Sequence, residues 1–257
     1  MKTMSQKYLC LLLFTSMMIL AQTRLSGMII WAFIACICLV TFAKKKKQFI
    51  YTSILFGFGF FVYLMTKEQV LFQNIGLARL LLVFQILPLI IMFLLLKQPI
   101  SFYGNVPKWN ELIWFPFIWS GFHSITVKKF LIIAVSINLM SLAPFYYDNL
   151  GILLERAVMG ILIFSLINAT LEEVIWRGLL LKLISNQLGE KWAVIITSIG
   201  FGLQHYSLGF SWLTCLFFTL GGLFYGGITV KSKSILPALM WHIVLNILMI
   251  ISGFIPL

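Results

Sequence analysis

Long apolar stretches dominate this chain, and few residues within them carry a charge. They lie approximately at residues 8–21, 27–43, 49–65, 79–96, 130–145, 157–171, 192–208, 211–230 and 235–255. Their lengths approach the roughly 20 residues of a membrane-spanning helix. Only 10% of the 257 residues are charged, whereas a soluble domain carries about 25%. We therefore predict an all-α, polytopic transmembrane bundle with nine spans, or eight if the short first stretch is interfacial.

Basic residues flank these stretches and produce the net charge of +12. A nucleic-acid-binding surface would need a basic patch or stripe on one face, so we expect no nucleic-acid partner. With an uncleaved first helix and a cytoplasmic N-terminus, alternating spans leave four of the nineteen basic residues at the outer side: Arg24, Lys67, Arg79 and Arg156. Cytoplasmic loops are typically rich in Lys and Arg. The asymmetry predicts a multi-pass protein of the plasma membrane with its N-terminus in the cytoplasm.

The segment of residues 97–129 contains Trp109, Trp114 and Trp119. Because tryptophan is enriched at the membrane–water interface, we expect this segment to lie at the headgroup level. His123 also lies in it, and we assign that residue no catalytic role.

Two of the seven acidic residues, Glu172 and Glu173, are adjacent within an apolar region. A charge at the centre of a membrane helix costs about 3 kcal/mol or more unless it is compensated. On a helix, Glu173 and Arg177 share a face and can pair. Glu172 points about 100° away from Glu173, which leaves it available for chemistry. If the sixth helix ends near Arg177, Glu172 lies roughly 8 Å from the cytoplasmic edge.

Two of the three histidines, His205 and His242, lie in apolar spans, and Asn246 follows His242 by four residues. Residues four apart share a helix face. A lone buried histidine is usually a hydrogen-bonded core residue, but ionisable residues in a membrane typically face the bundle interior and are functional. A glutamate can deprotonate water, and a histidine beside an asparagine can stabilise an oxyanion. We therefore predict a polar intramembrane cavity in the C-terminal half.

These residues form three motifs in order: Glu172-Glu173-x-x-x-Arg177, Phe201-x-x-x-His205 and His242-x-x-x-Asn246. Together they resemble the CAAX prenyl protease and bacteriocin-processing family, also called the type II CAAX endopeptidase or Abi family. The resemblance covers residues from about 165 to 250. We accordingly expect a catalytic core at residues 151–257, and N-terminal transmembrane helices of unassigned role at residues 1–150.

The resemblance implies a role for each motif residue. Glu172 would be the general base, with His205 as its partner in activating a water molecule. His242 and Asn246 would stabilise the oxyanion of the tetrahedral intermediate. Glu173 and Arg177 would form a supporting pair.

The residue types do not decide whether a metal cofactor takes part in catalysis. Glu172, His205 and His242 could ligate zinc with a position left for water, but the same residues also suffice for glutamate-driven catalysis without metal, which we favour. An aspartyl dyad is excluded because the chain contains one aspartate, and no His-Glu-x-x-His zinc helix occurs.

The expected function is that of an intramembrane endopeptidase acting on a membrane-associated peptide or protein. A short, lysine-rich chain favours a bacterial member, for which peptide processing or bacteriocin immunity is the expected context. The alternative is a non-catalytic membrane scaffold or immunity protein that keeps the fold. A small proton-coupled transporter fits less well, because internal repeats, which many transporters show, are absent here.

Overall fold

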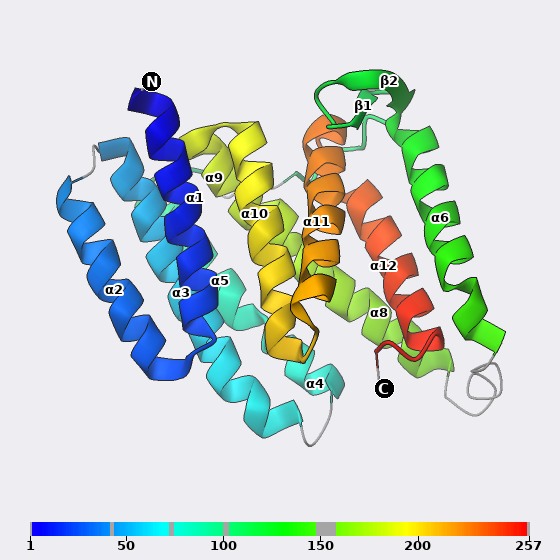
Figure 1. The fold of residues 1–257 in the computed structure, drawn as a ribbon, viewed down its shortest axis with the longest axis horizontal. Helices are drawn as coiled ribbons and strands as arrows, with labels where there is room; N and C mark the ends of the chain where they lie inside the picture. The colour runs from blue at the N-terminus through cyan, green and yellow to red at the C-terminus, as the bar shows by residue number, and fades with distance from the viewer. Residues whose placement is uncertain (1, 42–43, 72–74, 100–102, 148–157, 256–257) are drawn as a thin grey trace.

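The computed structural model describes residues 2–41, 44–71, 75–99, 103–147 and 158–255. These residues form a helical bundle with one small β-hairpin (Figure 1). In chain order the elements are α1 (Lys2–Ala21), α2 (Arg24–Thr41), α3 (Lys44–Leu71), α4 (Ile75–Leu80), α5 (Val83–Leu95), β1 (Leu112–Pro116), β2 (Gly121–Thr126), α6 (Val127–Tyr147), α8 (Val158–Glu173), η1 (Val174–Leu180), α9 (Leu181–Leu188), α10 (Glu190–Gln204), η2 (His205–Leu208), α11 (Trp212–Ser232) and α12 (Leu236–Ile251).

Every apolar stretch predicted from the sequence lies largely on a helix within the described residues. Among the residues that the structure describes, five helical segments are long and apolar enough to cross a membrane, namely residues 47–67, 78–95, 127–146, 158–188 and 212–232. Shorter apolar helices occupy residues 6–21, 25–39 and 236–251. The predicted helical membrane bundle is confirmed.

The basic ends of the helices gather at one end of the bundle. The N-terminus, the start of α3, the turn between α9 and α10, the hairpin, and the connection from α11 to α12 all lie at the upper end in Figure 1. These are the parts of the chain that carry most of the lysines. The arrangement fits the predicted alternation of spans, and the cytoplasmic location of this end stays a prediction.

The sixth helix is longer than the sequence predicted. Instead of ending near Arg177, it continues through η1 and α9 to Leu188. It ends at Gly189, whose positive φ of 89° is a conformation that glycine adopts without steric penalty. Leu188 is sixteen residues beyond Glu172, which corresponds to roughly 24 Å at about 1.5 Å per residue. Glu172 therefore lies near the middle of the helix and not close to its lysine-rich end.

The segment of residues 97–129 forms the hairpin, which the sequence did not predict. Strands β1 and β2 pair antiparallel, from Leu112 opposite Thr126 to Pro116 opposite Gly121. The hairpin leads directly into α6 and lies at the lysine-rich end of the bundle (Figure 1). Its location at the headgroup level stays a prediction.

One buried core joins the N-terminal helices to the C-terminal ones. The same hydrophobic cluster contains Phe14 of α1, Phe56 of α3, Trp176 of η1 and Phe201 of α10, and the rings of Phe56 and Trp176 meet edge to face with centroids 5.2 Å apart. The expected boundary between residues 150 and 151 falls in residues 148–157, outside the described residues.

Glycines allow close packing of α11 against α10. A Cβ atom on Gly222 would lie 3.1 Å from the backbone of Ser198, and one on Gly226 would lie 3.1 Å from the side chain of Val194. Small residues commonly permit such helix contacts in membranes. This packing aligns α11 beside the end of α10, where His205 lies.

Candidate active site

The Glu173–Arg177 pair predicted from the sequence is present and buried. Arg177 Nη1 donates to Glu173 Oε1 at 2.9 Å, and their side chains are 2% and 0% exposed. The guanidinium also lies over the ring of Phe201, 4.0 Å from its centroid. Arg177 belongs to η1, a π-helical segment, and such segments are rare and frequent at functional sites. Each side chain of the pair therefore compensates the charge of the other inside the bundle.

Glu172 contacts two groups on different helices. Its Oε1 lies 3.8 Å from Arg79 Nη1 of α4, and its Oε2 lies 3.7 Å from His242 Nε2 of α12. The residue is 1% exposed, and Oε2 has no hydrogen-bond partner in the described part of the chain. The carboxylate is thus positioned by a cation on one side and turned toward an imidazole on the other.

His242 links the two glutamates. Its Nδ1 donates to Glu173 Oε1 at 2.8 Å, because a carboxylate oxygen can only accept. In a neutral imidazole this leaves Nε2 as the unprotonated nitrogen, and Nε2 is the atom that faces Glu172. The ring of Tyr225 stacks on that of His242 with centroids 5.4 Å apart. Hydrogen bond and ring packing together hold the orientation of the imidazole.

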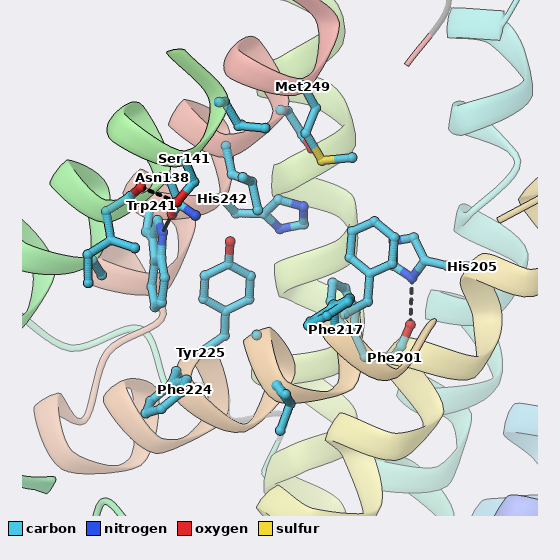
Figure 2. Close-up of a pocket in the computed structure, with 18 of the residues that line it drawn as sticks. Asn138, Ser141, Phe201, His205, Phe217, Phe224, Tyr225, Trp241, His242 and Met249 are labelled. Carbon is cyan, nitrogen blue, oxygen red and sulfur yellow. Dashed lines mark hydrogen bonds between the residues drawn. The ribbon is translucent and has the colours of Figure 1, made fainter. Parts of the chain in front are cut away.

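His205 lies at the end of α10 and is held by different contacts. Its Nδ1 donates to the backbone carbonyl of Phe201 at 2.7 Å, shown as a dashed line in Figure 2. Its ring stacks on Phe218 with centroids 3.8 Å apart. As in His242, the nitrogen without this bond is Nε2. Within the described residues, no carboxylate oxygen lies within 4 Å of a His205 nitrogen, so the predicted pairing of His205 with Glu172 is not a direct contact.

The site opens onto a cavity of about 1170 Å³. It lies between α6, α8, α11 and α12, with residues of the hairpin at one end, and its lining is mainly apolar. His205, His242, Asn246 and Arg79 line it, whereas Glu172 is not a lining residue but contacts two of them, Arg79 and His242. Figure 2 shows His242 and His205 coming from different elements around this space. The structure thus places the two histidines and Asn246 around one cavity.

Asn246 follows His242 by one helical turn and lies on the same side of α12, as predicted. It is 4% exposed, and its Nδ2 has no hydrogen-bond partner among the described residues. An unpaired buried donor costs about 1–3 kcal/mol. The Asn246 amide is therefore a donor available to a molecule in the cavity.

Arg79 is a site residue that sequence reasoning missed. The sequence placed it at the outer edge as one of four exceptional basic residues, but its side chain is only 12% exposed and contacts Glu172. It also donates to the hydroxyl of Tyr63 at 3.3 Å. Two adjacent buried carboxylates need two cations for neutrality, and the count of charges could have suggested a second arginine beside Arg177.

Two other residues of the N-terminal helices form hydrogen bonds to the backbone near His205. Lys67 of α3 donates to the backbone carbonyl of Ser207, two residues after His205. Gln22 donates to the carbonyl of Leu203 at 3.1 Å. Both contacts fix the end of α10 where His205 lies, so the N-terminal helices help to position a motif residue. At the hairpin end of the cavity, His123 belongs to the lining.

The suggested zinc ligands do not converge in the described residues. No group of three His, Cys, Asp or Glu side chains there is arranged to hold a metal ion. Glu172 and His242 are neighbours, whereas His205 lacks a carboxylate neighbour and is held by Phe201 and Phe218. As placed among the described residues, Glu172, His205 and His242 do not form a three-ligand site, and whether zinc takes part stays a prediction.

Comparison with known proteins identifies the C-terminal region. Residues 154–248 match the family model of the Rce1-like type II CAAX prenyl endopeptidases. No curated protein and no solved structure matched the chain. The matched region contains all three motifs and the helices that carry them, from α8 to most of α12. Over these residues the chain is similar to the Rce1-like type II CAAX prenyl endopeptidases, and this match supports a function of the CAAX-type intramembrane protease kind.

Proposed function

We propose that this protein is an intramembrane endopeptidase that hydrolyses a peptide bond of a membrane-associated peptide or protein, with Glu172 as the general base. One observation carries the proposal: Glu172, buried in the middle of a membrane helix, is held between Arg79 and His242 next to a large cavity. Oε2 has no hydrogen-bond partner in the described residues, which is also true of Glu173 Oε2. The two glutamates differ in their other contacts, because Glu173 Oε1 is bonded to both Arg177 and His242 Nδ1, whereas Glu172 faces the unbonded Nε2 of His242.

The proton path follows from the two histidine contacts. Glu172 takes a proton from a water molecule, and the resulting hydroxide attacks the scissile carbonyl. The proton then passes from Glu172 Oε2 to the facing Nε2 of His242, whose imidazolium form is stabilised by Glu173 at Nδ1. The protonated His242 and the Asn246 amide stabilise the oxyanion, and the proton finally goes to the leaving amine.

His205 acts from the cavity side in this scheme. Because Nδ1 is committed to the Phe201 carbonyl, Nε2 is the nitrogen that can accept a hydrogen bond from the attacking water. Glu172 and His205 then share one water molecule instead of contacting each other. The proposed chemistry needs no metal.

The cavity indicates the kind of substrate. Aromatic and aliphatic side chains from four helices line it, including Phe217 and Phe224 of α11. Such a lining favours an apolar peptide segment or a lipid-anchored one that enters from the bilayer. Peptide maturation or self-immunity in a bacterial plasma membrane, with a cytoplasmic N-terminus, is the cellular role that we propose.

The test is a set of single substitutions in protein reconstituted into lipid vesicles with a membrane-anchored fluorogenic peptide. Glu172→Ala, His205→Ala and His242→Ala should each lower the cleavage rate at least a thousandfold, while thermal unfolding in detergent shows a folded protein. The matched control is Glu190→Gln, because Glu190 is half exposed and pairs with Lys233 at the basic end. Near-normal cleavage by the Glu172 variant would contradict the proposed base.

Metal dependence is tested separately on the same preparation. Exhaustive chelation followed by elemental analysis should leave the cleavage rate unchanged and show less than one zinc per ten proteins. Loss of activity that is restored by stoichiometric zinc would contradict the metal-free scheme.

A further inference from the structure

Helices α8 and α12 pack antiparallel with a regular register through the site. Glu172 faces His242, and Phe164 and Ile250 share a small apolar cluster toward the other end of the two helices. Phe164 lies eight residues before Glu172 on α8, and Ile250 lies eight residues after His242 on α12. Equal steps in opposite directions are expected for two antiparallel helices that keep one register. Stepping one turn from Glu172 toward Phe164, and one turn from His242 toward Ile250, leads to Asn168 and Asn246. These two amides therefore lie at the same level, between the catalytic pair and the apolar cluster.

Asn168 has the properties of a binding residue. It is 3% exposed and lines the same cavity as Asn246. Its Oδ1 has no hydrogen-bond partner among the described residues, and the same holds for Nδ2 of Asn246. A buried polar atom without a partner costs about 1–3 kcal/mol. Two such atoms at one level of one cavity indicate a ligand that supplies the missing partners.

The two unpaired atoms are chemically complementary to a peptide backbone. Asn168 Oδ1 is an acceptor and Asn246 Nδ2 is a donor, and a peptide chain presents N–H donors and C=O acceptors. Ser165, one turn further along α8, is also buried and unpaired among the described residues, but it does not line the cavity. The apolar cluster of Ile161, Phe164 and Ile250 follows. The polar lining on this face is thus confined to the level next to the catalytic pair.

We propose that Asn168 is a substrate-binding residue whose side-chain oxygen accepts a backbone N–H next to the scissile bond, while Asn246 donates to the scissile carbonyl. The inference rests on the proposed function, and it deepens that function by specifying an extended peptide backbone as what the cavity recognises beside Glu172. Asn168 needs no proton transfer for this role, and its contribution is the alignment of the substrate.

The experiment uses the full-length protein in vesicles and a set of membrane-anchored fluorogenic peptides, in each of which one backbone N–H is replaced by an ester oxygen. In the wild type, one ester position should lower kcat/KM about tenfold, as expected for one lost hydrogen bond. Asn168→Leu, which is nearly isosteric, should lower kcat/KM of the unmodified peptide by a similar factor, mainly through KM. For this variant the same ester should cause no further loss.

Ser165→Ala is the matched control, because it removes a buried polar group on the same helix but outside the cavity lining. It should change kcat/KM less than twofold and should keep the ester effect of the wild type. Thermal unfolding of all variants in detergent reports on folding, and Asn168→Ala provides a second variant if the leucine does not fit.

The outcomes separate the two proposals. If the wild type cleaves and Glu172→Gln does not, but Asn168→Leu retains the full ester effect, the role of Asn168 is wrong and the peptidase stands. If the wild type cleaves none of the peptides, or Glu172→Gln cleaves them equally well, the proposed function is wrong and the role of Asn168 is overturned with it.

Discussion

The two walls of the cavity differ in how they are held. The wall to which α8 contributes adjoins buried charges of α8 and η1, which lie outside the lining and are paired with arginines and with His242. The wall formed by α6 faces largely outward, and only 17% of its apolar window is buried, compared with 44% for the helix of residues 158–188. On α6 the main polar link is the bond that Asn138 accepts from Trp241 Nε1 at 2.6 Å.

This difference suggests a division of roles. The chemistry requires side chains fixed within a fraction of an ångström, and the α8 wall provides this through charge-assisted hydrogen bonds. A substrate that arrives from the bilayer must pass a wall that can yield. In the proposed function, the α6 wall would be the passage for such a substrate, because its outer face is exposed and its hydrogen bond to α12 among the described residues is the one between Asn138 and Trp241. Substitutions in the first wall should therefore have larger effects than those in the second.

The largest expected effect follows from breaking the charge pair in the α8 wall. Arg177→Met leaves Glu173 without its arginine in the membrane interior, which should lower the free energy of unfolding by about 3–5 kcal/mol. Removing the exposed partner in the Lys233–Glu190 pair, whose side chains are both 42% exposed, should change it by less than about 1 kcal/mol. Denaturation in detergent followed by circular dichroism measures both. Equal losses would contradict the distinction between buried and surface pairs.

An intermediate effect is expected at Arg79, which joins the N-terminal helices to the same wall. Arg79→Gln removes the cation 3.8 Å from Glu172 Oε1 and should lower kcat about 10- to 100-fold, because an opposite charge within about 4–6 Å favours the charged form of a buried carboxylate. Arg79→Lys should recover part of the loss. Steady-state kinetics in vesicles gives both values. A variant with unchanged kcat would show that residues 154–248 supply the whole site.

The smallest effect is expected in the α6 wall. Asn138→Ala removes the bond to Trp241 and should lower the free energy of unfolding by about 1 kcal/mol. It should change kcat/KM less than tenfold, because the hydrogen bond of Asn138 is to Trp241, which is not one of the four proposed catalytic residues. If this substitution abolished cleavage in a folded protein, α6 would be part of the catalytic apparatus and the comparison of the two walls would be wrong.

The sequence predicted the helices and the site residues better than their spatial relations. Apolar length and the spacing of Glu173 and Arg177 are local properties, so the spans and this pair could be predicted directly. The contact between Arg79 and Glu172 joins residues 93 positions apart in the sequence, and no local pattern encodes it. Asn168 was overlooked because a single amide in an apolar run is inconspicuous until the register of α8 and α12 places it opposite Asn246.

Two further differences between the predicted and the observed secondary structure, the hairpin and the longer sixth helix, also have physical reasons. The hairpin of β1 and β2 pairs strands that are rich in aromatic residues, and in a membrane protein such residues equally indicate an interfacial segment. The helix containing Glu172 continues past Arg177 although Gly178 is a weak helix former. Gly178 is buried in η1, and tertiary packing overrides helix propensity. The first conformational break comes at Gly189.

The central claim is that the carboxylate of Glu172 activates the hydrolytic water. The most direct measurement is the cleavage rate of one membrane-anchored peptide by Glu172→Gln and by the wild type, at equal protein density in the same vesicles. The substitution keeps size and hydrogen-bonding capacity but cannot accept the proton. We predict a rate at least a thousandfold lower with an unchanged unfolding temperature. A folded variant that cleaves within tenfold of the wild-type rate would contradict the account.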